Sequence, residues 1–146
     1  MCGRKPKERW RPEYFGLRSV RNGGVRISVS FWGCTCYSGV GTITPFDGNL
    51  NTEKYISLLE NNLRQVVVKH FCTDPWILQD DNYPCHLSTR AKNWKNQNNI
   101  PCLDWPSQSP DLNVIENVWR RIKIRFAREQ HWIKTRQKLV EAVMRI

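Results

Sequence analysis

The hydrophobic pattern of this chain changes its period along the sequence, and each change limits the folds that the chain can adopt. Residues 25–33, VRISVSFWG, alternate apolar and polar side chains, which is typical of a strand with one buried face. Residues 39–46, GVGTITPF, form a second strand pattern, and the short link predicts an antiparallel hairpin. Apolar residues then recur at helical spacing over 52–66, after a capping Asn51 or Thr52.

Strand and helix patterns continue to alternate in the second half of the chain. A short apolar run at 75–79 predicts a buried strand, and residues 100–105 predict another short strand, with a polar segment of helical character between them. Ser109 and Pro110 suit the start of a last helix, in which Glu116 lies at the edge of the apolar face. That face consists of Leu112, Ile115, Val118, Trp119, Ile122 and Phe126. The order of elements predicts an α/β layer fold in a single domain.

Charge and composition narrow the class of protein. The 146-residue chain has a formal net charge of +10, and its basic residues are concentrated at the two ends. Residues 1–24 are basic, rich in Gly and Pro, and aperiodic, which predicts an arm ahead of a folded domain over 25–146. A basic surface favours binding to nucleic acid, although a solubilising excess of charge would look the same. No apolar run is long enough for a membrane span, and the six Cys, without CxxC pairs, indicate reduced thiols in an intracellular protein.

Three carboxylates lie where an α/β sheet usually places its functional groups. Asp80 and Asp81 follow the predicted strand at 75–79, and Glu116 lies in the first turns of the last helix. Carboxylates that converge in this way can hold Mg²⁺, and a pair of such ions can activate water for attack on a phosphodiester. On spacing alone, the simpler alternative is that Asp81 ends a strand and Glu116 is a surface charge.

Two longer motifs resemble the transposases of the Tc/mariner superfamily, in its Tc-like branch. These motifs are QDDNYPCH at 79–86 and WPSQSPDLNVIEN at 105–117, and shorter matches are FWG, GVGTI and LNTEKYISLLENNL at 31–33, 39–43 and 50–63. The resemblance implies a ribonuclease-H-like mixed sheet flanked by helices. It also implies an enzyme that cuts and joins DNA through two metal ions, Mg²⁺ or Mn²⁺, held by three carboxylates.

The resemblance assigns catalytic and metal-binding roles to two residues of this chain. Asp81 matches the family's second carboxylate and Glu116 its third, with 34 residues (82–115) between them. The Asn82-x-Pro84-x-His86 context favours Asp81 over Asp80, which occupies a position that is usually uncharged in the family. His86 also matches the pattern, where it would orient the loop or a phosphate, or serve as a structural histidine.

The family's first carboxylate lies on a central strand ahead of the hairpin, and residues 1–24 contain no Asp and no apolar strand pattern. The resemblance therefore predicts the C-terminal part of a transposase that lacks this strand and the N-terminal helix-turn-helix. We expect such a chain to hold its metal weakly and to be inactive alone. The implied partner is DNA, the implied location is the nucleus, and the full-length form could be a homodimer. The alternative is a non-catalytic, basic, nucleic-acid-binding remnant of a transposable element.

Overall fold

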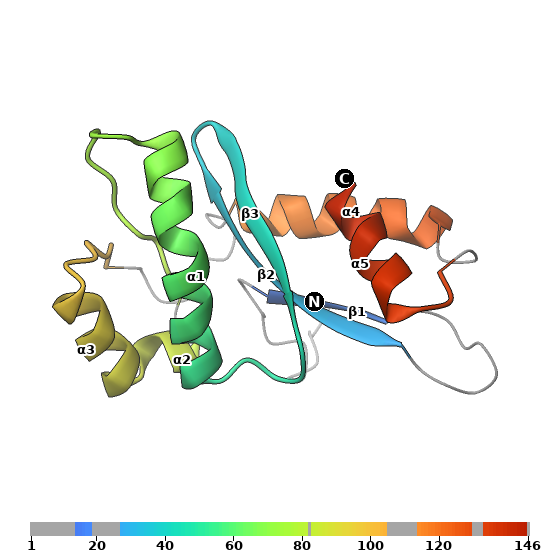
Figure 1. Ribbon diagram of the computed structural model, residues 1–146, viewed down its shortest axis with the longest axis horizontal. Helices are drawn as coiled ribbons and strands as arrows, with labels where there is room; N and C mark the ends of the chain where they lie inside the picture. The colour runs from blue at the N-terminus through green and yellow to red at the C-terminus, as the bar shows by residue number, and fades with distance from the viewer. Residues whose placement is uncertain (1–13, 19–26, 82, 105–113, 130–132, 146) are drawn as a thin grey trace, which may run out of the picture.

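The computed structural model describes residues 14–18, 27–81, 83–104, 114–129 and 133–145 (Figure 1). Within these ranges, three strands come first and helices fill the rest of the chain. The strands are β1 (Tyr14–Arg18), β2 (Ser28–Cys36) and β3 (Gly39–Phe46). The helices are α1 (Thr52–His70), α2 (Pro84–Leu87), α3 (Thr89–Gln97), α4 (Ile115–Glu129) and α5 (Arg136–Met144).

The predicted hairpin is confirmed, and it forms the centre of an antiparallel sheet in the order β1-β2-β3. A turn at residues 37–38 joins β2 to β3, and Gly39 after it has a φ of 127°, which favours glycine. The pairing of β2 with β3 shifts register between Cys34 and Thr35, which marks a bulge or irregularity near the end of β2.

The predicted aperiodic arm over residues 1–24 is wrong at residues 14–18, because β1 lies within it. Tyr14 pairs with Trp32 and Arg18 with Ser28, so the strand runs antiparallel to β2. Leu17 is buried in the same apolar cluster as Val29 and Phe31 of β2. Five residues give little periodicity of their own, and the contacts with β2 that stabilise this strand join distant parts of the sequence.

The predicted strands at 75–79 and 100–105 are reduced, over the described residues up to 104, to one isolated parallel bridge between Leu78 and Cys102, and Trp105 lies outside the described residues. Leu78 N donates to Pro101 O at 2.8 Å, and Leu103 N donates to Leu78 O at 2.9 Å. Ile77 is 62% exposed, although the run at 75–79 was expected to be buried, and Leu103 is 46% exposed. Parallel strands are stable when neighbouring strands and helices cover them, and residues 76–80 instead border a cavity.

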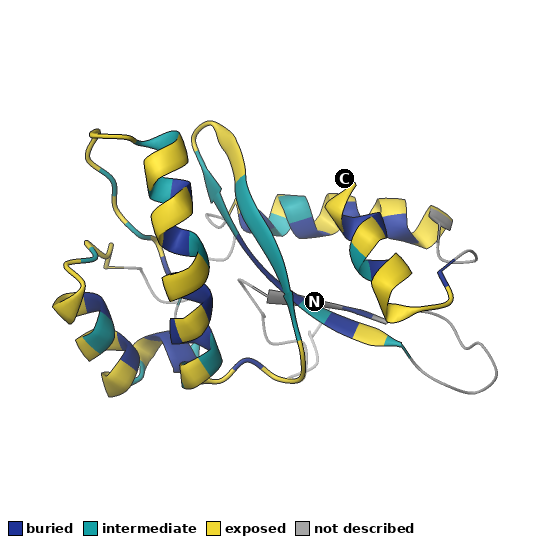
Figure 2. Ribbon diagram, in the orientation of Figure 1, coloured by how far each residue is buried: buried dark blue, intermediate teal, exposed yellow. Residues whose placement is uncertain are grey.

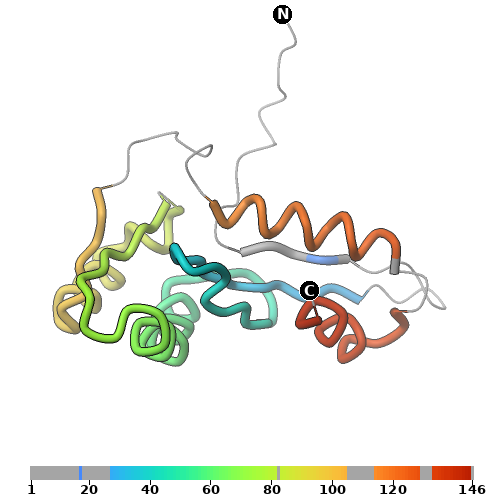
Figure 3. Tube along the Cα trace, turned by 90° about the horizontal axis from the view of Figure 1, so that it is seen from above, coloured from blue at the N-terminus to red at the C-terminus, as the bar shows by residue number. Residues whose placement is uncertain are grey.

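Helices pack on both faces of the sheet (Figures 2 and 3). Side chains of β2 belong to two different apolar clusters, as expected for a strand that is covered on both faces. Val29 and Phe31 belong to the cluster that α4 and α5 complete. Trp32 belongs to the cluster that α1 and α3 complete. Figure 3 shows α1 and α4 on opposite sides of the strands. The mixed α/β layer arrangement predicted from the sequence is confirmed.

The two long helices follow their predicted patterns. Asn51 caps α1 by accepting a hydrogen bond from Lys54 N at 2.9 Å, and the expected apolar residues of α1 are buried. In α4, Ile115, Trp119, Ile122 and Phe126 are buried, while Leu112 and the predicted cap at Ser109 fall outside the described residues. Cys34, Cys36, Cys72, Cys85 and Cys102 are all thiols. Of the described helices, none has the length and apolar character that crossing a membrane requires.

Candidate metal centre

Asp81 lies in the segment between Leu78 and α2, and a histidine fixes its carboxylate. His86 of α2 is 1% exposed, and its Nδ1 lies 2.8 Å from Asp81 Oδ1. Because a carboxylate accepts, His86 donates from Nδ1. Tyr83 N donates to the same oxygen at 3.1 Å. These contacts orient Asp81, and the burial of His86 favours the orienting role over direct contact with a phosphate.

Asp80, the neighbouring carboxylate, is buried and has two partners of its own. Tyr55 of α1 donates its hydroxyl to Oδ1 at 2.7 Å, and Lys95 of α3 donates to Oδ2 at 2.6 Å. Asp80 and Lys95 are 9% and 6% exposed, so they form a buried ion pair. The extra negative charge beside Asp81 is therefore neutralised internally. Both oxygens of Asp80 are engaged in packing the loop onto α1 and α3.

Glu116 lies in the first turn of α4, at the edge of the buried face as predicted. Partial burial raises the pKa of Glu116 above its ordinary value; the positive charge of Lys123 opposes this change and the negative charge of Asp81 adds to it. The contribution of Asp81 links the two carboxylates electrostatically, although they come from distant parts of the chain.

The chemistry of this pair fits a hard divalent cation, but the number of ligands is small. Asp81 and Glu116 offer carboxylate oxygens, which Mg²⁺ prefers, and His86 supports Asp81 from behind. Among the residues that the structure describes, no three His, Cys, Asp or Glu side chains group closely enough to hold an ion. A cation held by these two residues therefore needs a further donor.

The sequence profile of the DDE superfamily endonucleases matches residues 5–140 of this chain. The chain belongs to this family. It is 35% identical over 117 residues to the Tcb1 transposase of Caenorhabditis briggsae, covering 80% of this chain and 41% of that protein. The Tc1 transposase of Caenorhabditis elegans is 32% identical over 117 residues, with the same shares. The chain thus spans less than half the length of these DDE relatives.

Solved structures show the same fold for this DDE domain. The catalytic domain of Mos1 mariner transposase superposes with a TM-score of 0.55 at 14% identity, covering 90% of this chain and 74% of that one. A chain of the simian T-cell lymphotropic virus intasome gives a TM-score of 0.57 at 13% identity, covering 95% of this chain and 53% of that one. These neighbours confirm the predicted ribonuclease-H-like architecture.

Two residues around the centre were missed by sequence reasoning. Lys95 neutralises Asp80, and Tyr55, expected only as a core residue of α1, also donates to it. Lys95 follows Ala91 by one helical turn, and both are buried on the same face of α3. A lysine on an otherwise apolar helical face was the available sign that a buried carboxylate faces it.

Proposed function

We propose that this chain supplies Asp81 and Glu116 as metal-binding carboxylates for DNA strand cleavage and strand transfer. The observation that carries the proposal is the match of residues 5–140 to the DDE endonucleases, together with the Asp81 carboxylate that His86 fixes and Glu116 in the first turn of α4. The family membership supplies the reaction class. Work on DNA of this kind would be carried out in the nucleus. Because the chain spans 41% of the length of the Tcb1 transposase, the activity of a whole transposase is part of this proposal.

Each residue has a distinct task in this proposal. Asp81 would hold a divalent cation with the carboxylate that His86 orients, and Glu116 would hold it from α4. Such cations, when bound, supply activation of a water or hydroxyl nucleophile and neutralisation of the leaving oxygen. His86 keeps a proton on Nδ1 in this arrangement and so holds Asp81 in one orientation. The buried pair of Asp80 and Lys95 anchors the loop itself.

Asp81→Asn and Glu116→Gln are each expected to weaken Mn²⁺ binding by about tenfold or more, because even outer-shell partners of a metal have effects of this size. The Mn²⁺ affinity of the unchanged chain should also fall as the pH decreases, because protons compete with the metal for the Glu116 carboxylate. Since the pKa of Glu116 is raised, this fall should begin above pH 4.5, the ordinary pKa of a glutamate. Glu116→Gln removes that part of the pH dependence. Titration of the free Mn²⁺ signal by electron paramagnetic resonance measures both effects.

Asp74→Asn is the matched control, since Asp74 is an exposed acid on the loop after α1. It should leave Mn²⁺ affinity unchanged. Equal binding by the unchanged chain and by Asp81→Asn would overturn the metal-binding proposal. Without metal, the protonation of Glu116 also affects the stability of the fold. Because the pKa of Glu116 is raised in the folded chain, the free energy of unfolding should fall as the pH rises from 4.5 through the raised pKa.

Exposed basic residues on α4 favour DNA as the partner. Helix α4 carries Glu116 in its first turn and exposes five basic residues along its length. These are Arg120, Arg121, Lys123, Arg125 and Arg128. The whole chain carries a formal net charge of +10. Phosphate contacts from such a helix would hold a duplex next to the carboxylates. The same surface also favours the alternative, a nucleic-acid-binding protein without catalysis.

Arg121→Gln with Arg128→Gln is expected to weaken duplex DNA binding. It should also reduce the slope of log affinity against log salt by about 2, because each phosphate that is no longer neutralised lowers the slope by roughly one. Fluorescence anisotropy over a series of salt concentrations gives the slope. Lys92→Gln, an exposed cation on α3, should change it little. Affinity that does not decline with salt would contradict DNA binding through this helix. DNA binding without any Mn²⁺ binding would instead support the non-catalytic alternative.

A further inference from the structure

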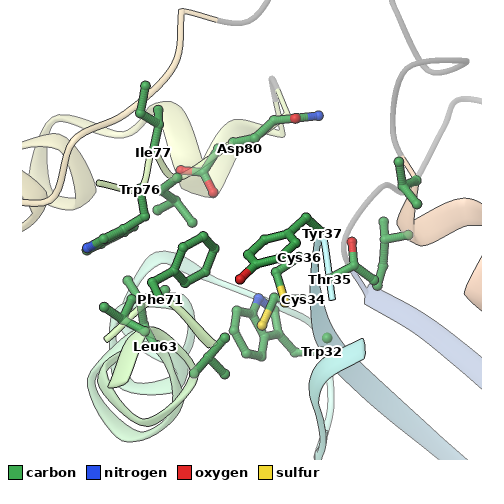
Figure 4. A pocket seen from close by; sticks show the side chains of 17 residues that line it. Trp32, Cys34, Thr35, Cys36, Tyr37, Leu63, Phe71, Trp76, Ile77 and Asp80 are labelled. Atoms are coloured by element: carbon green, nitrogen blue, oxygen red, sulfur yellow. The ribbon is translucent and has the colours of Figure 1, made fainter. Parts of the chain in front are cut away.

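The segment that leads into Asp80 and Asp81 has little support on one side. Residues 76–80 form one wall of a cavity of about 530 Å³, and Figure 4 shows Asp80 at this wall. Within the described residues, the β-bridge from Leu78 to Cys102 is the only strand pairing of this segment. A segment with few packed neighbours opens easily unless other contacts hold it. The loop after Leu78 therefore depends on side-chain contacts from α1 and α3.

The other end of this loop is the short helix α2, which has little stability of its own. It is four residues long, and its N-cap residue, Tyr83, makes no side-chain capping hydrogen bond. A helix of one turn forms too few backbone hydrogen bonds to offset the cost of ordering it. His86 lies in α2 and donates to Asp81, so the position of this donor must be fixed by contacts from outside the helix.

Lys95 contacts both ends of the loop. Its Nζ donates to Asp80 Oδ2 at 2.6 Å and to the carbonyl oxygen of His86 at 3.4 Å. The second contact suits a lysine, because a basic side chain can bind the carbonyl groups at the end of a helix. Lys95 is 6% exposed, so both contacts are shielded from water, which strengthens them. We call Asp80, Lys95 and His86, joined in this way, the clasp.

Tyr55 of α1 packs against all three members of the clasp. Its hydroxyl donates to Asp80 Oδ1 at 2.7 Å, and its ring centroid lies 4.2 Å from that of His86. Lys95 Nζ lies 5.7 Å from the same ring centroid. Tyr55 donates its one hydroxyl proton to Asp80, whereas Lys95 donates at each end of the loop. The two side chains can therefore be changed separately.

We propose that Lys95 is a positioning residue for the metal centre, because it holds His86, whose imidazole orients Asp81. His86 Nδ1 lies 2.8 Å from Asp81 Oδ1, and a displacement of α2 would lengthen this hydrogen bond. A carboxylate that has lost its orienting partner binds a cation more weakly, since binding must then order it. The proposal rests on the proposed function for its metal. The three carboxylates that the sequence resemblance implies do not account for the clasp.

A variant that keeps the fold but removes the clasp tests this role. Asp80→Asn with Lys95→Met removes both charges of the buried pair, so most of the stability should be kept, while the donor to the His86 carbonyl is lost. We expect Mn²⁺ affinity about tenfold lower than in the unchanged chain, the lower end of the effect of outer-shell partners. The free Mn²⁺ signal gives the affinity, and urea unfolding gives the stability.

Tyr55→Phe is the matched opposite of this double variant. It removes the hydroxyl from which Asp80 accepts, but it keeps the ring against His86 and both contacts of Lys95. We expect lower stability, since a buried carboxylate loses a donor, with unchanged Mn²⁺ affinity. Circular dichroism confirms beforehand that each variant is folded. Mn²⁺ affinity that falls in step with stability across both variants would overturn the proposal, because a structural role alone has that result.

A measurement without metal follows His86 itself. In the unchanged chain, Nδ1 carries the proton that His86 donates to Asp81. Nitrogen NMR of the chain with labelled histidines detects this protonated Nδ1, and the signal lost in His86→Gln assigns it. We expect the signal to remain in Tyr55→Phe and to be lost or averaged in Asp80→Asn with Lys95→Met. A double variant that keeps the signal would overturn the positioning role, whatever its Mn²⁺ affinity.

The proposed function and the role of Lys95 can fail separately. If Asp81→Asn leaves Mn²⁺ binding unchanged, the proposed function fails, while the NMR signal of His86 still decides whether Lys95 positions the imidazole. If Asp81→Asn weakens Mn²⁺ binding and Asp80→Asn with Lys95→Met does not, the metal site stands and Lys95 serves only the stability of the fold.

Discussion

Replacing Lys95 by methionine is expected to lower the free energy of unfolding by about 3–5 kcal/mol, the usual effect of removing one partner of a buried ion pair. Lys95 Nζ lies 2.6 Å from Asp80 Oδ2, and the two residues are 6% and 9% exposed. Methionine fills a similar volume, so the main loss is the compensation of the buried charge of Asp80. Tyr55 would remain as its hydrogen-bond donor. Urea unfolding followed by circular dichroism measures the change.

Two further variants separate the charge effect from the loss of packing. Asp80→Asn with Lys95→Met should recover most of the stability, because a neutral amide can still accept from Tyr55 and needs no cation. Arg90→Ala removes an exposed ion pair to Glu53, whose side chains are 68% and 58% exposed, and should change stability by less than about 1 kcal/mol. If the double variant were as unstable as Lys95→Met alone, burial of charge would not be the cause.

This buried pair also bears on which aspartate serves the candidate centre. Asp80 uses both oxygens to bind α1 and α3, whereas His86 and Tyr83 both bind the same oxygen of Asp81, Oδ1. Both oxygens of Asp80 thus serve the packing of the loop, which favours Asp81 as the aspartate of the proposed metal site.

Local features of the sequence were sufficient to predict the hairpin, α1 and the phase of α4. Period-2 alternation over residues 25–33 and a capping Asn51 act over a few residues and are visible without tertiary structure. Helical phase alone placed Glu116 at the edge of the buried face, where the structure has it. The pairing of Asp81 with Glu116 as metal ligands came from strand order and the resemblance together, and it stays a prediction.

Features that depend on distant contacts were not predictable in the same way. β1 is stabilised by pairing with β2 and by burial of Leu17, and its five residues give no clear pattern. The runs at 75–79 and 100–105 have strand composition, but over their described residues, 75–79 and 100–104, the structure gives only the bridge between Leu78 and Cys102. Composition fixes what a segment can form, while neighbours on both sides decide whether a parallel strand forms.

Trp119→Ala is expected to reduce stability by about 3–5 kcal/mol, as large aromatic truncations in a core do. Trp119 is 1% exposed and lies in the cluster that joins α4 and α5 to Val29 and Phe31 of β2. Its ring also occupies the space above Gly33, where an added Cβ would lie 2.7 Å from Cη2. The cavity left by alanine would loosen the start of α4, the element that carries Glu116.

A double-mutant cycle with Gly33→Ala tests this packing directly. Gly33→Ala alone should be destabilising by about 1–3 kcal/mol through overpacking against the indole. In the Trp119→Ala background the same change should have a much smaller effect, because the added methyl group then enters the cavity. Ile124→Ala, at a 53% exposed position of the same helix, is the control and should remain within about 0.5 kcal/mol. Equal effects of Gly33→Ala in both backgrounds would show that the indole does not restrict this glycine.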